Sequence, residues 1–137
     1  MNQEIILLVT DFNNGLLSLA SNVAAVCPDS IISANFKDIE KQIKKKENFC
    51  KFIDLFCIKV LQYKDQIDSG DESFFMNKDY KSDLHGQQDA TLDHVITLKS
   101  VWADLKQENK EIVMLNMQIL CELSQQYFNI MIQSIKK

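Results

Sequence analysis

The scarcity of residues that interrupt helices constrains the fold more than any other feature, because the 137 residues include only three glycines and one proline. Sheet proteins with many hairpins use these residues in their turns and bulges. Apolar residues instead recur at every third or fourth position, which places their side chains on one face of an α-helix. The hydrophobic content of 46% is sufficient for a buried core. We therefore predict an all-α protein, folded as a compact bundle of about five helices.

The first expected helix covers residues 2–26, where apolar residues form one broad face. Pro28 ends it, because proline disfavours helical geometry in the preceding residue. Asp29 or Ser30 then caps a second helix, since both side chains accept hydrogen bonds from free backbone N–H groups.

No glycine or proline separates the second helix from a third one that ends near residue 67. A single helix over residues 30–67 would be roughly 55 Å long, which is too long for a domain of this size. We therefore expect a break near residues 47–48.

The segment 68–93 differs from the rest of the chain because it has seven acidic residues and two lysines. It also contains two of the three glycines. We expect a long acidic connector with a short helix, and connections of this length are typically functional or mobile.

Two further helices are expected after the connector. Asp89 or Thr91 caps the fourth helix, a polar break follows at Gln107–Asn109, and the fifth helix covers roughly residues 110–135. The short break predicts that these two helices form an antiparallel pair. The whole chain, 1–137, then forms a single domain whose core includes Phe12, Leu16, Phe52, Phe56, Trp102, Leu105, Leu120 and Tyr127.

The charged residues argue against recognition of nucleic-acid bases. All fifteen basic residues are lysines, the net charge is −4 and the pI is about 5.1. Lysine does not replace the planar arginine side chain that binds guanine or phosphate with two parallel hydrogen bonds. We therefore expect a protein partner instead of a nucleic acid.

The cysteines and the N-terminal segment predict a cytoplasmic location. The four cysteines lack paired spacing, and no secretory signal accompanies them. Reduced, packed thiols are therefore expected. The longest wholly apolar run at the N-terminus, Ile5–Val9, is far too short for a membrane span.

Motifs for metal binding or catalysis are weak. His85 and His94 are nine residues apart and belong to no array with metal-ligand spacing, so we expect neither a metal nor another cofactor. The alternative is a small thiol-dependent enzyme or a metal-binding protein, with Cys27 beside a helix end or His94 as the reactive group.

Residues 68–73 read Asp-Ser-Gly-Asp-Glu-Ser, which matches the phospho-dependent destruction motif D-S-G-x-x-S read by an F-box ubiquitin ligase. In this interpretation Ser69 and Ser73 are phosphorylated. The structural alternative, which we favour, is a capping box in which Ser69 and Glu72 open the short connector helix.

Two stretches carry a resemblance to a known group. They are Phe52–Phe56 with Lys59–Ile67 and Gly70–Phe75, and Val101–Ile112 with Gln118–Ser124. They resemble segments of small all-helical proteins of nucleocytoplasmic large DNA viruses, in which a tryptophan and a Glu-Asn-Lys turn precede a helix with a glutamine and leucine stripe. The resemblance covers roughly residues 49–128. It implies a viral origin, an all-α fold and a non-enzymatic role, and it assigns no site residues.

The functional hypothesis is a viral protein that acts by protein contact in the virion or the infected-cell cytoplasm. The first and fifth expected helices have broad apolar arcs, and exposed apolar patches tend to be interfaces. The expected contact residues are Leu7, Leu17, Met114, Met117 and Met131, which together could form a homodimer interface. The alternative is that the two helices cover each other inside a monomer.

Overall fold

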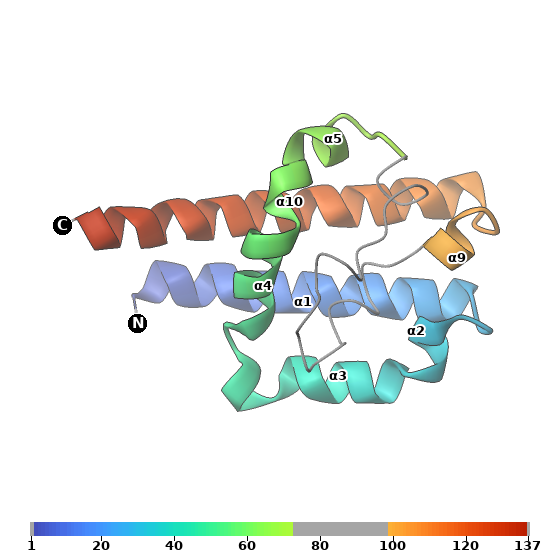
Figure 1. Ribbon diagram of the computed structural model, residues 1–137. Coiled ribbons are helices and arrows are strands. Elements are labelled where there is room, and N and C mark those ends of the chain that lie inside the picture. The colour runs from blue at the N-terminus through green and yellow to red at the C-terminus, as the bar shows by residue number, and fades with distance from the viewer. Residues whose placement is uncertain (1, 73–98, 137) are drawn as a thin grey trace.

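The computed structural model describes residues 2–72 and 99–136. Within these two ranges every regular element is an α-helix or a short 3-10 helix, and no strand occurs. The prediction of an all-α fold is therefore confirmed. Figure 1 shows the arrangement: two long helices lie side by side, and shorter segments pack across them.

The two long helices are α1 (Gln3–Val26) and α10 (Gln107–Lys136), and they run antiparallel, so that the start of α1 and the end of α10 lie at the same end of the pair (Figure 1). The side chain of Asn2 caps α1 by accepting a hydrogen bond from the backbone N–H of Glu4 at 2.7 Å. The helix ends before Pro28, as predicted.

A glycine allows α1 and α10 to approach closely. A methyl group added to Gly15 would lie 3.1 Å from Cδ2 of Leu120, which is fully buried in α10. The two helices thus cover much of each other's apolar surface. Within one chain, the two helices therefore pack against each other as the alternative stated above expects.

The chain between the long helices forms short elements that pack on one side of the pair. They are α2 (Ile31–Ala34), α3 (Phe36–Lys44), η1 (Lys46–Asn48), α4 (Lys51–Lys59), η2 (Leu61–Tyr63) and α5 (Lys64–Asp68). The helices α2 and α3 contact α1, α4 crosses both long helices, and α5 contacts α10 (Figure 1).

The predicted break at residues 47–48 is confirmed, since η1 and a turn separate α3 from α4. Two further breaks, at Asn35 and Val60, divide the segments that we expected to be continuous helices. The side chain of Ser30 accepts a hydrogen bond from the N–H of Ser33 at 3.1 Å, so Ser30 is the cap of the second helix.

The boundary before the last helix differs from the prediction. The helix α9 (Lys99–Trp102) ends in a turn at residues 103–106, and Gln107–Asn109 form the first turn of α10 and not a break. The rest of the expected fourth helix and most of the acidic connector lie outside the described residues. Among those described, the main partner of α10 is α1.

All eight residues predicted to form the core are buried. Phe12 of α1 and Phe56 of α4 contact each other edge to face, with ring centroids 5.2 Å apart and planes at 75°. Trp102 is 1% exposed, and Nζ of Lys110 lies 5.8 Å from its ring centroid. The core therefore joins the long helices to the shorter segments.

In the described part of the chain, even α1 and α10 lack the continuous apolar stretch that a membrane-crossing helix requires.

Candidate functional site

The five predicted contact residues lie in different environments. Leu7 is 58% exposed and Met131 is 38% exposed, whereas Leu17 and Met114 are half-buried and pack against the core. Met117 is fully buried, so the expectation that it belongs to a contact surface is wrong. The reason is that Met117 lies on the side of α10 that is covered by other helices.

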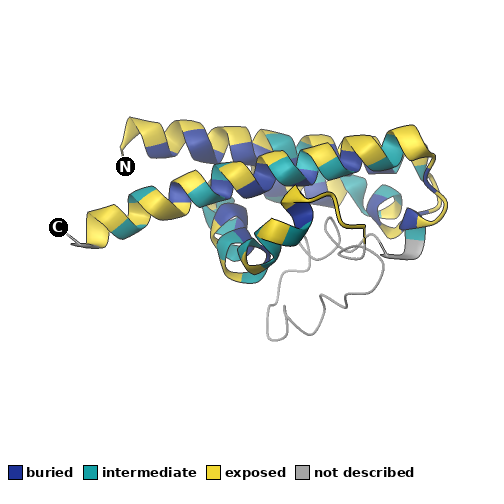
Figure 2. Ribbon diagram, turned by 90° about the horizontal axis from the view of Figure 1, so that it is seen from above, coloured by how far each residue is buried: buried dark blue, intermediate teal, exposed yellow. Residues whose placement is uncertain are grey.

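An apolar stripe instead follows the opposite side of α10. Ile112, Leu115 and Ile119 are 46%, 56% and 47% exposed and are spaced three and four residues apart, so they lie on one face of the helix. At 100° per residue, this face points away from the side that buries Val113 and Leu120. We call these three residues the outward stripe. Figure 2 shows that exposed residues run along the outer sides of both long helices.

Sequence reasoning named Ile112 only as one of the apolar residues of the last helix, and it did not single out Leu115 or Ile119. The sequence does indicate an exposed apolar stripe, because the apolar residues of this helix occupy almost its whole circumference. A helix with such a distribution must be covered on several sides or expose a stripe, and the pattern does not say which side is left uncovered.

Carboxylates accompany the outward stripe. Glu108, Glu111 and Glu122 are exposed on the same side of α10, and no basic residue occurs between Glu111 and Ile135. Lys110 is turned toward the Trp102 ring. This side of the helix therefore combines aliphatic side chains with negative charge.

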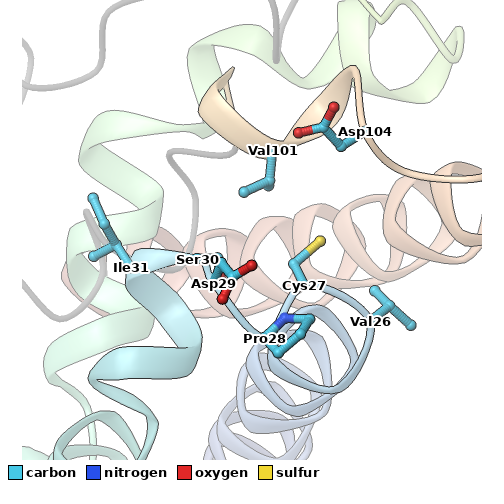
Figure 3. A pocket seen from close by; sticks show the side chains of 8 residues that line it. All are labelled: Val26, Cys27, Pro28, Asp29, Ser30, Ile31, Val101 and Asp104. Atoms are coloured by element: carbon cyan, nitrogen blue, oxygen red, sulfur yellow. The ribbon is translucent and has the colours of Figure 1, made fainter.

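An open pocket of about 460 Å³ lies at the turn after α1. Its lining includes Cys27, Asp29 and Ser30 from the turn, and Val101 and Asp104 from the region of α9. The Cys27 side chain points toward the α9 segment (Figure 3). The pocket lining thus includes a thiol and two carboxylates.

The Cys27 thiol is not activated by this environment. Burial raises its pKa above the ordinary value, and the nearby Asp104 carboxylate raises it further. A thiol with a raised pKa is protonated at neutral pH, and the protonated form is a poor nucleophile. His94, the other predicted reactive group, lies outside the described residues.

The remaining thiols lie between α4 and α10. Burial and the nearby Asp54 raise the pKa of Cys57 to about 12, and burial raises that of Cys121 to about 12. Burial also raises the pKa of Cys50. The thiol of Cys57 donates to the carbonyl oxygen of Ser124 at 3.5 Å, so this group serves helix packing.

A tyrosine–carboxylate hydrogen bond joins the same two helices. The hydroxyl of Tyr127 donates to Oδ1 of Asp54 at 2.6 Å. Burial and this bond both raise the tyrosine pKa. The contact fixes the crossing of α4 over α10.

Metal binding finds no support in the part of the chain that is described, where no group of three histidine, cysteine or acidic side chains is placed to share an ion. His85 and His94 lie outside it.

The Asp-Ser-Gly stretch ends α5. Gly70 has a φ of +75°. Its N–H donates to the carbonyl oxygen of Ile67 at 3.0 Å, and the N–H of Asp71 donates to the carbonyl oxygen of Gln66 at 3.1 Å. These two bonds form the Schellman motif that closes helix C-termini. The exposed Ser69 donates its hydroxyl to the same Gln66 carbonyl at 2.8 Å. Ser73 and the helix expected after it lie outside the described residues, so phosphorylation stays a prediction.

Comparison with protein-family models, curated proteins and solved structures finds no match to this chain. The resemblance to proteins of large DNA viruses therefore stays a prediction.

Proposed function

We propose that this chain is a non-enzymatic, helical interaction or assembly protein, of viral origin, which acts by protein contact in the virion or the cytoplasm of the infected cell. The observation that carries the proposal is the outward stripe: Ile112, Leu115 and Ile119 form an aliphatic row on a solvent-facing side of α10. Helices of this kind are recognised through side chains at positions i, i+3 and i+7.

The thiol chemistry supports the non-enzymatic part of the proposal. An enzyme that used Cys27, Cys50, Cys57 or Cys121 would need a lowered thiol pKa, and all four are raised. The alternative of a thiol-dependent enzyme predicts rapid alkylation of at least one thiol under native conditions. Our proposal predicts slow alkylation of all four.

Self-association is a second form of the same proposal. Because α1 and α10 pack against each other inside one chain, a dimer would have to use other surfaces, such as the exposed Leu7 and Met131. Light scattering at tens of micromolar distinguishes the two states, since a monomer has a mass of 15.8 kDa. Substituting Leu7 by a charged residue would reduce the mass of a dimer built through α1.

The proposal is tested by placing a photo-crosslinking amino acid at position 115 and expressing the protein in the cell that naturally makes it. We expect a crosslinked product of discrete mass. The matched control is position 58, because Ile58 is also aliphatic and is 65% exposed, but lies on α4. The absence of a product at position 115, or equal products at both positions, would contradict a contact through the outward stripe.

A further inference from the structure

We infer that the outward stripe binds a basic amphipathic helix of another protein. This inference rests on the proposed function and specifies the partner's chemistry. It combines the spacing of the aliphatic side chains with the distribution of charge over the two sides of the molecule.

The shape of the stripe suits a helix. Ile112 and Ile119 are seven residues apart, which corresponds to roughly 10 Å along the α10 axis, or two helical turns. Leu115 lies between them on the same face. A partner helix with aliphatic residues at positions i, i+3 and i+7 presents a row of the same length.

The charge around the stripe favours a basic partner. Glu108 and Glu111 are exposed, and no lysine forms an ion pair with either of them in the described residues. The Glu122 side chain is 60% exposed although its carboxylate lies 3.8 Å from Nζ of Lys64. Glu108, in the first turn, also stabilises the N-terminus of α10. Glu111 accepts a hydrogen bond from Nε2 of Gln107 at 3.5 Å, and both carboxylates are exposed to a cation on a partner.

The charged residues of α1 are also acidic. Its outer side includes the exposed Glu4 and Asp11, and no lysine occurs in the sequence before Lys37. The lysines of α3 and α4 lie on the shorter segments that pack against the long pair, and Lys64 of α5, which pairs with Asp68, lies 3.8 Å from Glu122. Lysine or arginine side chains beside the aliphatic residues of a partner would thus meet complementary charge.

The charge pattern disfavours a second copy of this chain as the occupant. A twofold contact through α10 would bring Glu108, Glu111 and Glu122 of both copies together, while Lys110 is turned toward the Trp102 ring, and like charges oppose association. A contact with the basic α3 of a second copy lacks apolar anchors, because Ile39 and Ile43 of α3 are buried.

The test uses three fluorescent synthetic helical peptides and measures binding by anisotropy. The first peptide has leucines at positions i, i+3 and i+7 with flanking lysines, the second has serines in place of the leucines, and the third has glutamates in place of the lysines. We expect the first to bind at least tenfold more tightly than the others. Equal binding of the first and second peptides would mean that the leucines do not contribute and that only charge attraction holds the peptide. This result would overturn the inference.

Protein variants locate the site. Leu115→Ala should weaken binding of the first peptide about tenfold, as for a central contact residue, whereas the matched control Ile58→Ala should leave it unchanged. The double substitution Glu108→Lys and Glu111→Lys should shift the preference from the lysine peptide toward the glutamate peptide. An equal loss in Leu115→Ala and Ile58→Ala would place the binding elsewhere and contradict the inference.

The outcomes separate this inference from the proposed function. A crosslinked product at position 115 without binding of the first peptide would support the contact surface but contradict a basic helix as its partner. A crosslinked product with twice the mass of the chain would identify a second copy as the occupant and also reject it. If neither a crosslinked product nor peptide binding is observed, both the proposed function and this inference are wrong.

Discussion

The long helices and the segment between them are built from the same apolar spacing but fold differently. The helix α1 continues for 24 residues and α10 for 30, whereas the chain from Ile31 to Asp68 forms six short elements. The breaks in the second region are not caused by glycine or proline, because Ile31 to Asp68 contains neither residue. The breaks therefore depend on side-chain hydrogen bonds and packing and not on breaker residues.

Asparagine side chains stabilise these breaks. Nδ2 of Asn48 donates to the carbonyl of Gln42 at 2.9 Å, at the end of α3. Nδ2 of Asn13, in α1, donates to the carbonyl of Phe49 at 2.8 Å, before α4 begins. Carbonyl groups without intrahelical partners need such donors when water is excluded. The continuous region thereby holds the interrupted one in place.

The largest expected effect comes from removing the aromatic contact between the two regions. Phe56→Ala should lower the free energy of unfolding by about 3–5 kcal/mol, because a fully buried ring is replaced by a cavity. Urea unfolding followed by circular dichroism measures the change. A loss below about 1 kcal/mol would mean that α4 does not depend on packing against Phe12.

A smaller effect is expected for the hydrogen bond from α1 to the break. Asn13→Ala should cost about 1–2 kcal/mol, since the Phe49 carbonyl loses its donor in a partly buried position. Asn14→Ala is the matched control, because its side chain is exposed on the same helix. Because alanine has the higher helix propensity, Asn14→Ala should be neutral or slightly stabilising. Equal changes in the two variants would mean that the hydrogen bond to Phe49 has no role.

Gly15→Ala should reduce stability by about 1 kcal/mol. The added methyl group improves helix propensity by about 1 kcal/mol, but it meets the fully buried Leu120, and overpacking costs about 1–3 kcal/mol. In a Leu120→Ala background the same substitution should instead be stabilising. A double-mutant cycle measured by urea unfolding compares the two, and additive effects would disprove a close approach of the long helices at this point.

The smallest effect at neutral pH concerns the thiols between α4 and α10. The pKa values of Cys57 and Cys121 rise from 9.0 to about 12 on folding, so above pH 9 the unfolded chain binds fewer protons than the folded one. Stability should therefore be unaffected by these groups between pH 6 and 8 and should fall between about pH 9 and 12. The free energy of unfolding of Cys57→Ala should depend less strongly on pH across this range. An unchanged pH dependence would contradict a raised pKa of Cys57 in the folded protein.

Local signals predicted the parts of the fold that depend on one segment at a time. Pro28 located the end of α1, and the apolar spacing identified buried residues as distant in sequence as Phe12 and Tyr127. The start of α10 was misplaced because its polar first turn was interpreted as a break, although Glu108 there stabilises a helix N-terminus.

The candidate site was less predictable, because it depends on which neighbours cover each side of a helix. The apolar residues of α10 surround its axis, so spacing cannot show that Met117 faces the core and Leu115 faces solvent. That assignment follows from the positions of α1, α4 and α5 against α10, and these contacts join residues far apart in the sequence.

The pairing of α1 with α10 also has a kinetic consequence. Helical proteins usually fold fast because most of their contacts are local, but this interface joins two helices separated by about 80 residues. The loop between them must close before the interface can form, and the entropic cost of closure grows with loop length. Folding should therefore be slow for an all-α chain of this size. A circular permutant that connects the end of α10 directly to the start of α1, which lie at the same end of the pair, would make the interface local and accelerate folding.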